Sequence, residues 1–154
     1  MCFRDASFCF VSRELIKGAE LMKRKNMILT NNPLVSEKQP GNLPVEYLET
    51  DYMGVLKAAR DKIHSGAILL THPLYGSVKP GETPYRSLLI REGGSEVDFQ
   101  SLRLIEAAME TCRKFTERTG LFGVGSIRDF QVVDLSLLMS ALGDFRESGQ
   151  TFIQ

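Results

Sequence analysis

The chain has 154 residues, of which 43% are hydrophobic and 25% charged, a balance typical of one globular domain. Lys plus Arg and Asp plus Glu number 19 each, so no net charge favours nucleic acid or an anionic lipid surface. The longest apolar runs are too short to cross a bilayer, and the three cysteines show neither zinc-ligand spacing nor a disulfide pattern. We therefore expect a cytoplasmic protein with no metal, no cofactor, no nucleic-acid partner and no membrane contact.

Residues 1–21 differ in composition from the rest of the chain. They contain two of the three cysteines and three of the nine phenylalanines, without a clear strand or turn pattern. From Met22 onward, a few basic residues lead directly into a β-type run, as at a bacterial start. We interpret residues 1–21 as a translated leader and residues 22–154 as a single α/β domain. An amphipathic helix over residues 12–25 is the alternative.

The first half of this domain alternates strand and turn signals. Residues 26–30 predict a strand, which the turn-forming Asn-Asn-Pro at residues 31–33 ends. Residues 36–42 are polar and predict a loop, and residues 44–49 predict a second, weaker strand.

The clearest local signals lie in the middle of the chain. Asp51 stands where a helix N-cap belongs, and apolar residues at helical spacing follow it as far as Ile63, before Gly66. Residues 67–71 are continuously apolar, which favours a central strand of a parallel sheet with side chains buried on both faces. Residues 86–91 predict a fourth strand.

Two further helices are predicted near the C-terminus. Residues 98–119 carry one continuous apolar face, and residues 135–145 carry a second. The start of the last helix stays open, because Asp129 or Asp134 could cap it. If Asp134 is the cap, residues 130–133 could form a fifth strand.

Strands that alternate with helices indicate βαβ units. We therefore predict a single three-layer α/β domain with a small, mainly parallel sheet covered by helices. Between the last two helices, residues 121–127 contain two glycines and predict a loop or a weak strand.

Polar loops follow two of the predicted strands. Residues 31–33 follow the first strand, and residues 72–84, rich in Gly and Pro, follow the apolar one. Ligands of open α/β sheets bind beyond the carboxyl ends of the strands. The two loops should therefore lie together at one cleft.

Several side chains of these loops could bind a small carboxylate or phosphate. His72 titrates near neutral pH, and Arg86 can clamp a carboxylate through two parallel hydrogen bonds. The ligand-binding candidates are Asn31, Asn32, His72, Ser77, Lys79, Tyr85 and Arg86. The alternative is that the proline-bracketed loop is scaffold whose polar groups close turns, and for Asn32 we favour that structural role.

The same loops carry a family resemblance. Residues 28–35 (Ile-Leu-Thr-Asn-Asn-Pro-Leu-Val), 70–80 (Leu-Thr-His-Pro-Leu-Tyr-Gly-Ser-Val-Lys-Pro) and 83–87 (Thr-Pro-Tyr-Arg-Ser) resemble the GrdX family over residues 22–145. Its small proteins are encoded in the glycine, sarcosine and betaine reductase gene clusters of amino-acid-fermenting anaerobes. The resemblance implies a cytoplasmic accessory protein with reductase components as partners. It does not identify any catalytic residue in this chain.

The alternative function is a small anionic-ligand-binding domain or minor enzyme that uses the loop over residues 72–86. The chain shows no paired nucleophile and base, which favours a non-enzymatic protein over an enzyme.

Overall fold

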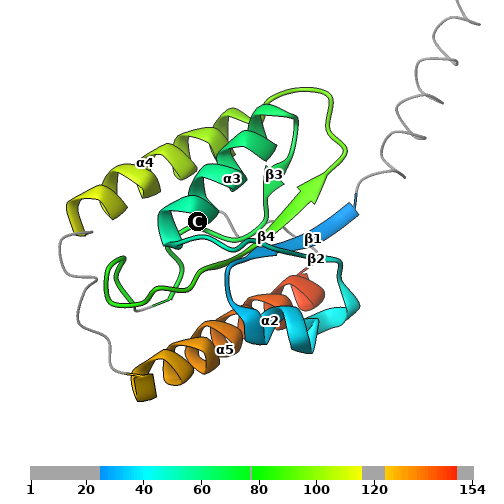
Figure 1. Cartoon of the computed structure of the whole chain (residues 1–154). Helices are drawn as coiled ribbons and strands as arrows, with labels where there is room; N and C mark the ends of the chain where they lie inside the picture. Colours follow the sequence, from blue (N-terminus) through cyan, green and yellow to red (C-terminus); the bar gives the residue numbers. More distant parts are fainter. Residues whose placement is uncertain (1–24, 77, 116–123, 149–154) are drawn as a thin grey trace, which may run out of the picture.

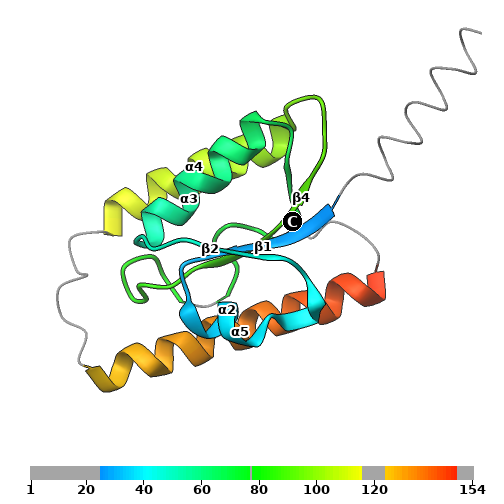
Figure 2. The same cartoon turned by 45° about the vertical axis from the view of Figure 1, so that its right-hand side comes forward.

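The computed structural model describes residues 25–76, 78–115 and 124–148. Its strands are β1 (Lys25–Thr30), β2 (Val45–Tyr47), β3 (Ile68–Leu69) and β4 (Ser87–Glu92), which form one sheet in the order β2-β1-β4-β3. Its helices are α2 (Pro33–Lys38), α3 (Tyr52–His64), α4 (Phe99–Phe115) and α5 (Val124–Ser148), with a short 3₁₀ turn, η1 (Pro40–Asn42). Helices α3 and α4 cover one face of the sheet, and α2 and α5 lie on the other (Figures 1 and 2).

The mixed α/β class is confirmed, but the predicted strand directions are wrong. Only β1 and β2 pair in parallel among the described strands, whereas β4 runs antiparallel to both β1 and β3. The chain reaches β4 from β3 through a long loop instead of a helix, so no βαβ crossover joins them.

The position predicted for residues 67–71 is also wrong, because β3 lies at an edge of the sheet. Leu69 and Leu70 are nevertheless fully buried, in apolar clusters on opposite faces. Helices above and below the sheet bury both side chains, so burial on both faces did not require a strand on each side.

Side chains complete the hydrogen bonding of this edge strand. Leu70 N–H donates to the Leu89 carbonyl of β4, and the neighbouring Leu69 N–H donates to Ser101 Oγ of α4 at 2.9 Å. Beyond β3, the hydroxyl of Thr71 accepts from Leu89 N–H at 3.1 Å, where a strand would offer a carbonyl. The ladder is thus extended by a hydroxyl group.

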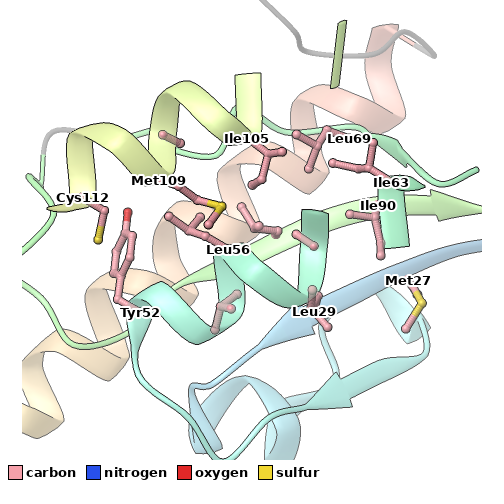
Figure 3. Packing of buried hydrophobic residues seen from close by; sticks show 14 residues of the cluster. Met27, Leu29, Tyr52, Leu56, Ile63, Leu69, Ile90, Ile105, Met109 and Cys112 are labelled. Carbon is pink, nitrogen blue, oxygen red and sulfur yellow. The ribbon is translucent and has the colours of Figure 1, made fainter. Parts of the chain in front are cut away.

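The larger apolar cluster fills the space between the sheet and helices α3 and α4 (Figure 3). Its fully buried members from the helices include Leu56, Ile63, Ile105 and Met109. The predicted cap of α3 is confirmed, since Asp51 Oδ1 accepts from the backbone N–H three residues later at 2.7 Å.

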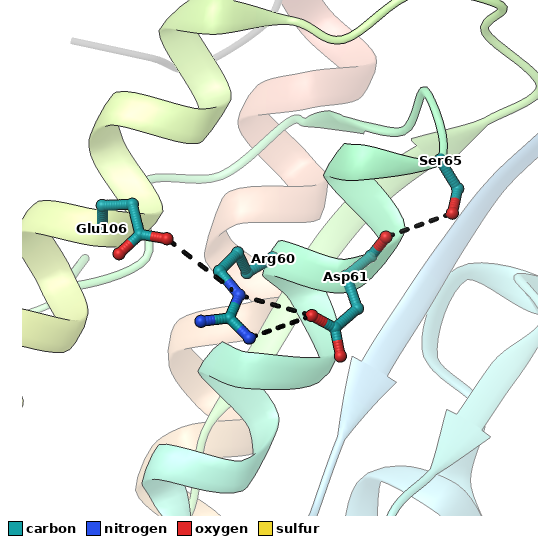
Figure 4. Close-up of polar contacts among 4 residues, drawn as sticks. All are labelled: Arg60, Asp61, Ser65 and Glu106. Atoms are coloured by element: carbon teal, nitrogen blue, oxygen red, sulfur yellow. Dashed lines mark hydrogen bonds and ion pairs between the residues drawn. The ribbon is translucent and has the colours of Figure 1, made fainter.

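Charged groups at the surface also join the two helices of this face. Arg60 of α3 lies 3.1 Å from Asp61 and 4.0 Å from Glu106 of α4, and Ser65 Oγ donates to the Asp61 carbonyl at the end of α3 (Figure 4). These charges are partly exposed, so each pair contributes at most about 1 kcal/mol. Apolar packing dominates this layer.

The second cluster, between the sheet and helices α2 and α5, is smaller. Its buried members are Ile28, Val35, Leu70, Leu89, Leu138 and Leu142. Fewer apolar side chains hold these two helices to the sheet, and polar contacts at the strand ends complete their attachment.

Helix α2 was not predicted. Asn32 caps it, its Oδ1 accepting from Leu34 N–H at 3.0 Å, and Pro33 occupies the first helical position. Proline is tolerated there because its missing N–H would have no helical partner. The predicted turn at residues 31–33 is therefore a helix start, and the predicted loop over residues 36–42 contains the end of that helix and η1.

The C-terminal boundaries also differ from the prediction. Helix α5 begins at Val124, so the expected loop or weak strand is wrong over residues 124–127, and so is the strand considered for residues 130–133. Asp129 and Asp134, the two residues considered as its cap, both lie inside the helix. The predicted helix over residues 98–119 is confirmed as far as Phe115. Residues 116–119 and the predicted leader, residues 1–21, lie outside the described residues.

Candidate functional site

Several of the predicted site residues lie together at one end of the strands. Asn31 follows β1, and His72 lies three residues beyond β3. Because β4 is antiparallel to both β1 and β3, its first residues lie at the end of the sheet where those two strands finish. Arg86 directly precedes β4. Arg86 N–H donates to Asn31 Oδ1 at 2.8 Å, which joins the two loops.

Asn31 is an internal connector. Its side chain is 5% exposed, and its amide nitrogen donates to the carbonyls of Thr50 at 3.0 Å and Pro84 at 2.9 Å. Its oxygen accepts from Arg86 N–H. Both ends of the amide are therefore used to hold three chain segments together, as expected of a buried polar side chain.

A buried carboxylate anchors α5 to the same end of the strands. Asp134 is 4% exposed, and its Oδ2 accepts from Asn32 Nδ2 at 2.9 Å and from Ser87 Oγ at 2.6 Å. Its Oδ1 accepts from Ser87 N–H at 3.1 Å. Since the Ser87 hydroxyl hydrogen goes to the carboxylate, Thr30 donates to Ser87 Oγ in their 2.6 Å contact. We call Thr30, Asn32, Ser87 and Asp134 the strand-end network.

Sequence reasoning missed Asp134 as part of this site. It was considered only as a helix cap. The residues that donate hydrogen bonds to its carboxylate, Asn32 and Ser87, are 102 and 47 residues away in sequence. The available signal was a carboxylate in the same helical stripe as Leu138 and Leu142, two buried residues.

Arg86 fastens the loop that follows β3. Its side chain is 2% exposed, and both terminal nitrogens donate to the Tyr75 carbonyl at 2.9 Å. One of them also donates to the His72 carbonyl at 3.4 Å, and the guanidinium carbon lies 4.1 Å from the centre of the Tyr75 ring. The Tyr75 hydroxyl in turn donates to the Ser87 carbonyl at 3.0 Å. We call Arg86, His72 and Tyr75 the arginine clasp.

His72 is held by its own loop. Its Nδ1 accepts from Leu74 N–H at 3.1 Å, so the neutral ring carries its proton on Nε2. Partial burial, and secondarily the positive charge of Arg86, lower the pKa of His72 from its ordinary value of 6.5. The ring is therefore mostly neutral at pH 7.

The other predicted site residues have separate surroundings. The Tyr85 hydroxyl accepts from Gln131 Nε2 of α5 at 3.1 Å. Lys79 is exposed, and its backbone N–H donates to Glu82 Oε2 at 3.2 Å. Ser77 lies outside the described residues. The structure therefore groups Asn31, Asn32, His72 and Arg86 at the strand ends, whereas Lys79 forms hydrogen bonds with Glu82 and with none of these four.

A cavity of about 300 Å³ lies between this loop and α5. It is lined by Thr71, His72, Tyr75, Leu137, Ser140, Ala141 and Asp144. Neither Asn31 nor Asn32 lines it, so the two polar loops meet through hydrogen bonds and not around this cavity. Within the described ranges, no three His, Cys, Asp or Glu side chains are arranged to hold a metal ion.

The fold and the contacts at the strand ends define a small mixed α/β protein. Buried Asn, Arg and Asp side chains fasten its strand-end loop. The chain belongs to the GrdX-like protein family, whose model matches residues 27–143. The family resemblance of the loops is thereby confirmed. No curated protein and no solved structure matched the chain. None of the described helices has the length and apolar character needed to span a bilayer.

Proposed function

We propose that this protein is a cytoplasmic accessory protein of glycine, sarcosine or betaine reductase, which acts through protein contacts and not as an enzyme. Membership of the GrdX-like family supports the link to these reductases. The protein's part in that link is inferred from how the strand-end loop is built.

The arginine clasp carries the proposal. Arg86 is the group best suited to bind a carboxylate or phosphate, yet its terminal nitrogens donate to the carbonyls of Tyr75 and His72. Residues 72–75, the first part of the loop, are therefore held against Arg86 by internal hydrogen bonds. A preformed loop loses little conformational entropy when a protein partner binds it.

The outer part of this loop offers charged groups to such a partner. Lys79 and Glu82 are exposed, and a turn in which Glu82 N–H donates to the Lys79 carbonyl at 3.0 Å holds them close together. Adjacent charges of opposite sign favour a polar, specific contact over a purely apolar one.

Binding to purified reductase components tests the proposal. Each component is immobilised, and the full chain is titrated over it while binding is followed by biolayer interferometry. We expect saturable binding to at least one component, weakened about tenfold or more by Lys79→Glu. Lys114→Glu, at an exposed lysine of α4, is the matched control and should bind like wild type. Absence of binding to every component would contradict the proposal.

The cavity beside His72 favours a second candidate, the binding of a small carboxylate or phosphate. Calorimetric titration with glycine, acetyl phosphate and phosphate tests it in wild type and in His72→Ala. His64→Ala, which changes an exposed histidine of α3, is the control. An Arg86 variant is unsuitable, since it would release the loop. No heat of binding to wild type at millimolar concentrations would rule out these three ligands.

A further inference from the structure

The outward face of α5 exposes large apolar side chains. Val132 is 51% exposed, Val133 42% and Met139 52%. Helix α5 runs along the sheet (Figure 2). Its opposite face, with Leu138 and Leu142, already packs there in the smaller apolar cluster. A helix that is apolar on two sides is typical of one that is covered on both.

Part of this face forms a regular stripe. Val132, Ser136, Met139 and Gly143 are all exposed and are spaced by four, three and four residues, the spacing of a helix–helix seam. A Cβ atom placed on Gly143 would meet nothing within 4 Å, so the end of the stripe is open to close approach. We call these four residues the α5 stripe.

Charges of opposite sign flank the stripe. With 3.6 residues per turn, Arg128 and Arg146 fall on one side of it and Asp129 and Glu147 on the other. All four side chains are exposed, and none forms an ion pair with another of the described residues. Arg146 donates a 3.4 Å hydrogen bond to the Gly41 carbonyl.

This pattern is complementary to itself in one orientation. When two copies of such a helix pack in parallel about a two-fold axis, the basic flank of each faces the acidic flank of the other. Arg128 then lies against the second copy's Asp129, and Arg146 lies against its Glu147. Antiparallel pairing would place basic flank against basic flank, which opposes association.

We propose that the α5 stripe is the contact surface for a second copy of this chain, packed in parallel and in register. The two copies would meet at Val132, Ser136 and Met139, with the flanking charges setting the orientation. A single helix pair is small for a stable interface, so the dissociation constant should be roughly micromolar.

Sedimentation equilibrium of the full chain tests whether it associates. We expect a monomer–dimer equilibrium across about 5 to 300 µM, with Met139→Glu raising the dissociation constant at least about tenfold. Phe99→Glu is the matched control, because Phe99 is 79% exposed on α4 and should not affect association. Thermal melts check that both variants fold.

Charge swapping and cross-linking test the orientation. Arg146→Glu should weaken the dimer, and adding Glu147→Arg should restore it, because the exchanged flanks match again. In a chain with Cys2 and Cys9 changed to Ser, Val132→Cys should form a disulfide-linked dimer on mild oxidation. Parallel packing brings residue 132 of one copy beside residue 132 of the other, whereas antiparallel packing separates them.

Three results would overturn the proposal. The first is a monomer at every concentration. The second is a dimer disrupted by Phe99→Glu and unaffected by Met139→Glu, which would place the interface elsewhere. The third is a dimer that a chain beginning at Met22 no longer forms, which would assign the contact to residues 1–21.

Discussion

The two faces of the sheet are covered in different ways. On the α3 and α4 face, fourteen buried residues form one apolar cluster, whereas on the α2 and α5 face only six described residues are buried together. The second face adds the strand-end network, in which the Asp134 carboxylate accepts three hydrogen bonds. Apolar contacts are non-directional, but hydrogen bonds fix distance and angle. Helix α5 is thus positioned on the sheet by a few directional hydrogen bonds together with a small apolar cluster. Helices α3 and α4 are held by a larger number of non-directional apolar contacts.

The largest effect should come from the apolar face. Leu69 and Leu70 are adjacent and equally buried, but Leu69 belongs to the larger cluster and Leu70 to the smaller. We expect Leu69→Ala to lower the free energy of unfolding by about 2–5 kcal/mol, measured by urea denaturation. Leu70→Ala should cost less, because its surroundings can relax more easily. An equal or larger loss at Leu70 would contradict the contrast between the faces.

Removing the buried carboxylate should break the polar face. Asp134→Ala leaves the Ser87 N–H, the Ser87 hydroxyl and one Asn32 N–H bond without their acceptor, so we expect a loss of about 2–4 kcal/mol. Glu37→Ala, at an exposed position of α2 on the same face of the sheet, is the control and should stay within about 0.5 kcal/mol of wild type. Equal stability of the two variants would show that apolar contacts alone hold α5.

The smallest expected effect is the pH dependence of the arginine clasp. The pKa of His72 is lower in the folded state than its ordinary value of 6.5, so below that value the unfolded chain binds more protons. The stability that depends on neutral His72 is present above pH 6.5 and is lost as pH falls through the lowered pKa. Urea denaturation from pH 7.5 to 5 should show this slope in wild type, and His72→Gln should reduce it. An unchanged slope would mean that other groups cause it.

The helices of the apolar face could be predicted because their signals are local. Asp51 caps α3 and apolar residues recur at helical spacing in α3 and α4, so neighbouring residues define each helix. The order and direction of the strands could not be predicted from local signals, because strand pairing joins segments such as β1 and β4 that are more than 50 residues apart. An apolar run such as residues 67–71 signals burial but does not say what covers it.

The candidate site was only partly predictable for the same reason. The loops that follow β1 and β3 were identified as polar and unusual, and the structure brings them together through Asn31 and Arg86. The roles of these side chains depend on partners across the sheet. Arg86 was expected to face a ligand, but its two terminal nitrogens donate to carbonyls of its own loop. Asn-Pro at residues 32–33 matches a turn and a helix start equally well, and in the structure it starts a helix, whose cap Asn32 also donates to the distant Asp134.

The serine that meets β3 affects how copies of this chain can aggregate. An exposed strand edge is a template on which another chain can add a strand, the first step towards fibrillar assembly. In this protein the outward N–H of Leu69 is already bonded to the Oγ of Ser101, a residue of α4. Strand addition at β3 would have to break this bond and displace the helix. Growth of an intermolecular sheet from this edge is therefore disfavoured, and the length of the strand, only two residues, disfavours it further.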